Sequence, residues 1–100
     1  MDQMNYKSKK WKRLREAALR RDNYLCQASA RYGRTVQATT VHHILPVRDY
    51  PEYSYKLWNL ISLSAAEHNR LHDRDTDSLT IEGLRLADKI LKKIERKEID

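Results

Sequence analysis

The sequence predicts a small α+β domain in which two short strands lie between helices. Its 100 residues favour a single domain spanning residues 1–100. Apolar residues recur at helical spacing toward both ends of the chain, whereas runs rich in β-branched or apolar residues mark two strands in the middle. The predicted order is therefore helix, strand, strand, helix, helix.

The first predicted helix runs from about Lys9 to Arg21. Ser8 is a suitable N-cap, because its hydroxyl oxygen can accept a hydrogen bond from an unsatisfied backbone N–H of the first turn. Trp11, Leu14 and Ala18 follow at helical spacing and give the helix one apolar face. Most of the remaining side chains are Lys or Arg.

Two strands are predicted in the middle of the chain. Residues 36–45 are rich in β-branched side chains, and Pro46 ends that run because it cannot donate to a strand ladder. A polar loop leads to a second apolar run over residues 57–63. These strands and the helix that follows form a predicted core over about residues 36–74.

Two helices are predicted after the strands. Ser64 and Glu67 have the spacing of a capping box, which predicts a helix from there to about His72. The last helix covers about residues 80–96 and is expected to pack into the core through apolar residues at spacings of three and four, which are Ile81, Leu84, Ala87, Leu91 and Ile94.

Composition narrows the function classes. No apolar run approaches the ~20 residues that a membrane-spanning helix needs, and the N-terminus lacks the apolar stretch of a signal peptide, so we expect a cytoplasmic protein. The single cysteine, Cys26, cannot form an internal disulfide and is expected to be a small buried residue.

The net charge is +6, and residues 1–34 hold ten basic and three acidic residues. This segment indicates either nucleic-acid binding or a solvated helix face.

All four histidines fall in two tight pairs. His42 and His43 are adjacent in a predicted strand, so their side chains should point to opposite faces. His68 and His72 are spaced i, i+4 on a predicted helix, which places both imidazoles on one face, a common way to present two ligands to a metal. Taken alone, each pair is more often structural or surface-exposed than functional.

Taken together, the motifs resemble the HNH family of endonucleases, also called His-Me finger or ββα-metal nucleases. The matching stretches are Val41–Pro46, Trp58–Leu63 and His68–His72, preceded by a lead-in over residues 11–26 that is similar to short phage-type members. The resemblance covers roughly residues 8–74. It implies a ββα-metal core with flanking N- and C-terminal helices.

The resemblance also implies a metal-dependent DNA endonuclease that hydrolyses phosphodiester bonds. His43 matches the general base, and an imidazole suits that role because it titrates near neutral pH. Asn59 matches the asparagine that braces the loop carrying the base. His42, His68 and His72 match the ligands of one divalent metal, for which Mg, Mn, Ni, Co or Zn are the candidates.

Many relatives carry two Cys-x-x-Cys pairs that bind a structural zinc. The matching positions here are Cys26 with Ser29 and Ser64 with Glu67, so three of the four ligands are absent and no structural zinc is expected. Our hypothesis is that the Ser64–Glu67 cap starts the ligand helix in place of the zinc.

The expected partner is double-stranded DNA, whose phosphates would be contacted by basic residues outside the histidine pairs, namely Lys9, Lys10, Lys12, Arg13, Arg48 and Arg70. The resemblance to phage-type members implies DNA-packaging proteins as candidate partners and an infected or prophage-carrying bacterial cell as the location. The alternative is a non-catalytic nucleic-acid-binding module with a structural metal. A toxin-like nuclease ranks lower, and RNA stays open as a substrate.

Overall fold

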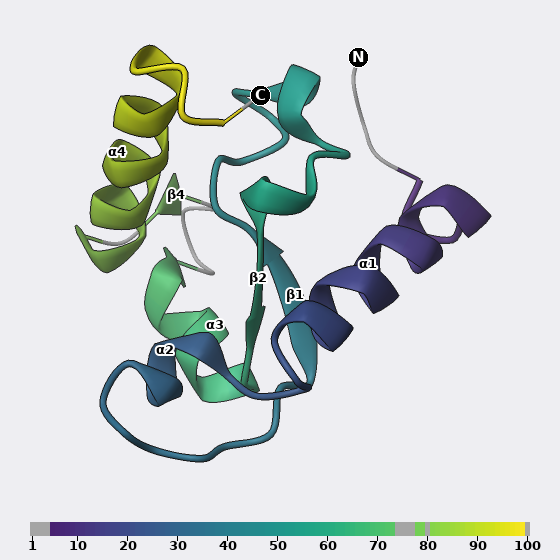
Figure 1. Cartoon of the computed structure of the whole chain (residues 1–100), viewed down its shortest axis with the longest axis vertical. Helices are drawn as coiled ribbons and strands as arrows, with labels where there is room; N and C mark the ends of the chain where they lie inside the picture. Colours follow the sequence, from purple (N-terminus) through teal and green to yellow (C-terminus); the bar gives the residue numbers. More distant parts are fainter. Residues whose placement is uncertain (1–4, 74–77, 80, 100) are drawn as a thin grey trace.

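The computed structural model describes the backbone of residues 5–73, 78–79 and 81–99, and the side chains within these ranges except those of residues 70–82. An antiparallel hairpin of β1 (Thr40–His43) and β2 (Leu60–Leu63) lies at the centre (Figure 1). Helix α1 (Lys9–Arg21) lies on one side of it, and α2 (Gln27–Ala30) and α3 (Ala65–Leu71) lie toward one end. The small α+β fold that the sequence predicted is confirmed. None of the described helices is both long and apolar enough to cross a membrane.

The hairpin register pairs Thr40 with Leu63 and His43 with Leu60. Both strands are shorter than predicted. Residues 57–59 form a 3-10 turn, η2, rather than the start of a strand, so β2 offers only four residues for pairing. In this register η2 ends the pairing after His43, and the helix that starts at Ala65 ends it before Thr40. Outside the hairpin, Leu25 and Gln37 form an isolated bridge.

Helix α1 (Lys9–Arg21) has the predicted bounds. The Ser8 hydroxyl accepts a hydrogen bond from the Trp11 backbone N–H at 3.1 Å, which satisfies one of the unpaired donors of the first turn. Trp11 and Ala18 pack with Leu60 of β2 in a small buried cluster. The apolar face of α1 thus holds the helix against the hairpin.

A polar clamp joins the end of α1 to β2. The Arg21 guanidinium forms two hydrogen bonds with the Asp22 carboxylate and also donates to the carbonyls of Leu57 and Leu60, at 2.9 and 2.6 Å. The same carboxylate accepts from the Ser62 backbone N–H at 3.2 Å. Because Leu57 and Leu60 flank Asn59, the clamp fixes the turn that carries this residue.

A second cluster covers the other end of the hairpin. A one-turn helix, α2 (Gln27–Ala30), replaces part of the predicted loop, and Cys26 just before it packs with Leu63 in full burial. The expectation of a small buried cysteine is confirmed. Burial raises the pKa of the Cys26 thiol, but hydrogen bonds from Ser29 and Ser64 oppose this and leave the pKa lowered overall.

Helix α3 (Ala65–Leu71) starts at the predicted cap, where the Ser64 hydroxyl accepts from the Glu67 backbone N–H at 3.3 Å. The helix ends one residue before His72, which starts β3 (His72–Asp73) and pairs with Leu79 of β4 (Ser78–Leu79). The prediction of a helix through His72 is therefore corrected, because strand pairing takes this residue out of the helical ladder.

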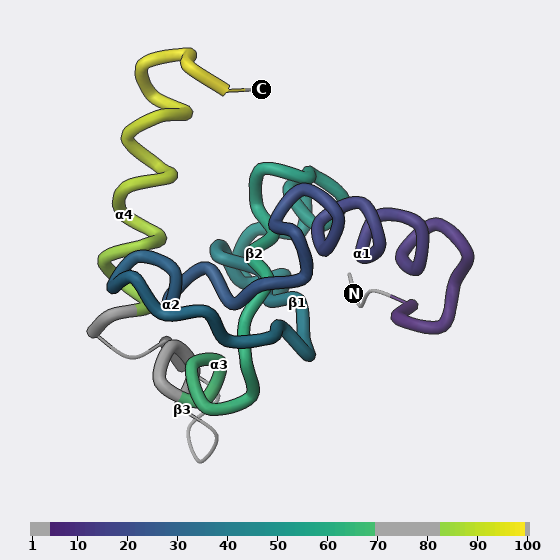
Figure 2. Tube along the Cα trace, turned by 60° about the horizontal axis from the view of Figure 1, so that its bottom comes forward, coloured from purple at the N-terminus to yellow at the C-terminus, as the bar shows by residue number. Residues whose placement is uncertain are grey.

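Helix α4 (Ile81–Glu95) lies on the opposite side of the molecule from α1, as both views show (Figure 2). It packs against α3 and β4. Ala87 is buried and Leu86 contacts the Cys26 cluster, but Leu84 is 56% exposed. Of the residues expected to pack into the core, Ala87 is buried and Leu91 and Ile94 are half-buried, whereas Leu84 lies outside the packed face. The side chain of Ile81 lies outside the described residues.

Candidate active site

One pocket of about 480 Å³ gathers three of the four histidines. Its walls come from the segment leading into α1, from α1 and β1, from the turn after β1, and from α3. The residues that line it are Tyr6, Trp11, Arg15, Thr40, Val41, His42, His43, Pro46, Val47, Arg48 and His68. Histidines from the two pairs therefore meet in one place, although the pairs lie far apart in the sequence.

His43 is buried and is held by one hydrogen bond and by ring contacts with Trp11 and Tyr6. Its Nε2 lies 2.9 Å from the Ser54 carbonyl oxygen. A carbonyl oxygen can only accept, so Nε2 carries the proton and the neutral ring keeps its lone pair on Nδ1. Trp11 stacks on the imidazole, with ring centroids 5.1 Å apart and planes inclined by 22°. The ring is thus fixed in both position and tautomer.

Burial also sets the charge state of His43. Desolvation lowers the pKa of the imidazole below its ordinary value of 6.5, and the hydrogen bond to the Ser54 carbonyl opposes that shift only in part. The net direction favours the neutral form at neutral pH. A neutral imidazole with a lone pair on a defined nitrogen can accept a proton from water.

Asn59 is fully buried and holds two loops together. Its Oδ1 accepts from the Leu45 backbone N–H at 2.7 Å, and its Nδ2 donates to the carbonyls of Leu45 and Tyr53, each at 3.1 Å. Leu45 follows the strand that carries His43, and Tyr53 precedes Ser54, whose carbonyl holds the His43 ring. Asn59 therefore ties together both segments that position the imidazole.

His42 and His68 form the described pair of metal-binding candidates. His42 is 8% exposed, and its ring centroid lies 5.0 Å from that of His68 at an interplanar angle of 75°. Within the described side chains, no three His, Cys, Asp or Glu residues form a cluster able to hold a metal ion. The third predicted ligand, His72, has its side chain outside the described residues.

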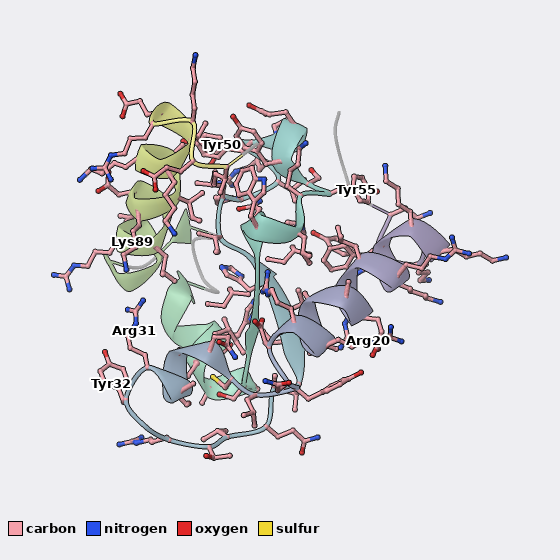
Figure 3. All side chains as sticks on the ribbon, viewed as in Figure 1. Arg20, Arg31, Tyr32, Tyr50, Tyr55 and Lys89 are labelled. Carbon is pink, nitrogen blue, oxygen red and sulfur yellow. The ribbon has the colours of Figure 1, made fainter. Side chains whose placement is uncertain are left out.

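The structure separates the basic residues that were predicted to contact DNA. Arg48 lines the histidine pocket, whereas Lys10 and Arg13 line a second groove of about 390 Å³ with Tyr55. The Lys10 ammonium lies 4.0 Å from the Tyr55 ring centroid. Lys9 and Lys12 are exposed on α1, from which basic side chains project outward (Figure 3). The side chain of Arg70 lies outside the described residues.

Sequence reasoning missed three pocket residues. Trp11 was interpreted only as an apolar residue of the helix, Arg15 only as part of the basic charge, and Tyr6 was not singled out. Tyr6 contacts the Trp11 ring edge to face, at a centroid distance of 5.3 Å. The positions of Trp11 and Arg15, spaced i, i+4 on one helix face, were the signal that could have paired them.

Comparison with known proteins gives one informative match. No protein-family model and no curated protein matches the chain. Among solved structures, it is similar to the HNH endonuclease of the deep-sea thermophilic bacteriophage GVE2, crystallised with a manganese ion. The two chains share 40% identity over 65% of this chain and 71% of that one, with a TM-score of 0.63.

The chain has a hairpin followed by a helix, and its similarity to a phage HNH endonuclease at this identity defines it as a nuclease of the ββα type. The chain belongs to the HNH endonuclease family.

Proposed function

We propose that this chain is a metal-dependent DNA endonuclease in which His43 is the general base. The observation that carries the proposal is the fixed state of the His43 ring: it is buried in a pocket, and Nε2–H is directed to the Ser54 carbonyl. The lone pair on Nδ1 has no hydrogen-bond partner among the described residues. It is therefore available to take a proton from a water molecule beside a phosphodiester.

The chain's own residues hold that base ready. Trp11 covers one face of the imidazole, Asn59 joins the two loops around it, and the Ser54 carbonyl fixes the tautomer. A base held in one orientation needs no reorganisation when the proton moves. The proton removed from water goes to Nδ1 and gives an imidazolium, whose Nε2–H bond to Ser54 is strengthened by the charge.

We further propose that His42, His68 and His72 hold one divalent metal. The two described imidazoles lie close together at the pocket, and imidazole nitrogen suits Mn, Ni, Co or Zn, while Mg prefers oxygen ligands. The manganese ion of the GVE2 enzyme is consistent with this donor set. When bound, the metal would stabilise negative charge on the phosphate and the departing oxygen.

Double-stranded DNA is the proposed substrate. The exposed residues of α1 and Arg48 at the pocket provide positive charge for phosphate contacts. The proposed contacts are Lys9, Lys10, Lys12, Arg13, Arg48 and Arg70. Phosphate contacts of this kind position a duplex without reading its sequence.

The test is cleavage of supercoiled plasmid with Mg, Mn, Ni, Co or Zn, with EDTA controls and the His43→Ala variant. We expect metal-dependent cleavage that falls by about 10²- to 10⁴-fold in the variant, the usual contribution of a general base. Circular dichroism of the variant checks that it is folded. Equal cleavage by both proteins would refute the role of His43. DNA binding without cleavage under any metal would favour the non-catalytic binding module.

A further inference from the structure

Arg15 differs from the other basic residues of the chain. It is the one Lys or Arg whose side chain is partly withdrawn from water among the described side chains, where all others are exposed. Arg15 lines the histidine pocket. Its Nη2 donates to the Thr39 carbonyl oxygen at 3.5 Å, at the long limit of a hydrogen bond.

Arg15 forms no ion pair with a carboxylate among the described residues. Arg20 is paired with Glu16 and Arg21 with Asp22, whereas Arg15, like Arg13, has no such partner. A cation that is partly removed from water is costly unless an anion compensates for the lost hydration. We therefore expect the lost hydration of Arg15 to be compensated by an anion from outside the described part of the chain.

The pocket in which Arg15 lies fits an anionic ligand. Arg15 and Arg48 both line the pocket, and no Asp or Glu is among its described lining residues. The hydroxyl-bearing residues Tyr6 and Thr40 also line the pocket, and a hydroxyl can donate to an anion. A guanidinium offers a planar set of N–H donors that matches two oxygens of one phosphate.

We propose that Arg15 binds a backbone phosphate of the strand that is being cleaved, in the same pocket as the base. This inference rests on the proposed nuclease function and adds a substrate contact to it. It also divides α1 into two surfaces. Arg15 faces the reaction pocket, whereas Arg13, two residues earlier, lines the separate groove beside Tyr55 and contributes only general attraction for DNA.

Arg13 provides a matched control on the same helix. Arg15→Met and Arg13→Met each remove one positive charge and keep an unbranched apolar stem, so long-range electrostatics change equally. Single-turnover cleavage of a labelled duplex with Mn²⁺ measures the effect on the reaction. We expect Arg15→Met to slow cleavage at subsaturating protein by about ten- to a hundredfold, the range for a hydrogen bond to a charged group, while Arg13→Met changes it much less.

Duplex affinity in EDTA is the second readout. We expect Arg15→Met to bind more weakly than Arg13→Met at the same salt concentration, and Arg15→Lys to recover only part of the loss, since it keeps the charge without the planar fork. Urea unfolding verifies that the variants are folded, and Arg15→Gln replaces Arg15→Met if the latter is not. Equal behaviour of the Arg15 and Arg13 variants in both assays would overturn the inference. A wild type that binds but never cleaves would instead defeat the nuclease proposal, and the affinity comparison would still decide the role of Arg15.

Discussion

At the scale of single residues, the chemistry of His43 depends on the balance between burial and one hydrogen bond. Burial lowers its pKa below 6.5, because the charged ring is poorly solvated, and the Ser54 carbonyl opposes the shift by favouring the protonated ring. In the unfolded chain the imidazole regains its ordinary pKa and binds a proton first as the pH falls. The stability that this difference provides is present above pH 6.5 and is lost as the pH falls through the folded pKa.

We therefore predict that His43 in the metal-free protein has the Nε2–H tautomer and titrates below pH 6.5. Nitrogen-15 NMR of the imidazole reports both properties in one titration, and the spectrum of His43→Ala assigns the signals. The titration is done without metal, so that release of a bound metal as the pH falls does not shift the curve. A proton on Nδ1, or a pKa at or above the ordinary value, would contradict the assignment.

At the scale of elements, Ser64 connects the β2 strand to the helix that carries His68. Its hydroxyl accepts from the Glu67 backbone N–H. We predict that Ser64→Ala lowers the free energy of unfolding by about 1 kcal/mol, the usual cost of losing an N-cap. Urea denaturation measures this, and Ser64→Thr, which keeps the acceptor oxygen, should retain most of the stability. Ser64 also contacts the Cys26 thiol. Ser64→Ala is therefore repeated in a Cys26→Ala background, where it should lower the free energy of unfolding by the same amount. An unchanged unfolding midpoint would refute the capping hypothesis.

The elements that sequence reasoning placed well are those specified by neighbouring residues. The bounds of α1 follow from the Ser8 cap and the spacing of Trp11 and Ala18, all of which are local. The predicted strand over residues 36–45 was too long, because β-branched composition does not reveal where the partner strand ends. Strand β2 is bounded by η2 at Asn59 and by the cap of α3 at Ser64. His72 was placed on α3 because its pairing with Leu79 depends on a segment further along the chain.

The candidate site shows the same division between local and long-range information. The resemblance predicted His43 and Asn59 as site residues. In the structure the Ser54 carbonyl accepts from the His43 ring, and the carbonyl of the preceding residue, Tyr53, accepts from the Asn59 amide. Their support from α1 could not be predicted. The Arg21 contacts span 36 and 39 residues of sequence, and the stacking of Trp11 on His43 joins two elements that no local pattern connects.

At the scale of the whole molecule, the proposed metal would link parts of the fold that otherwise meet at the pocket. His42 lies on β1, His68 on α3 and His72 at the start of β3, so one ion would join three elements. A ligand that binds only the folded state stabilises it by mass action. Loss of a metal ligand should therefore reduce the stability that the metal adds, and thermal unfolding measures this without any cleavage.

We predict that Mn²⁺ raises the melting temperature of the wild type, corresponding to about 2.7 kcal/mol at a concentration of a hundred times the dissociation constant. His42→Ala, His68→Ala and His72→Ala should each remove most of this increase. His43→Ala is the matched control, because it deletes an adjacent imidazole that is assigned to the base rather than to the metal. The control variant should abolish cleavage and keep the full thermal shift. If instead His43→Ala lost the shift while His72→Ala kept it, the ligand and base assignments would have to be exchanged, because the metal would then be bound by the other face of β1.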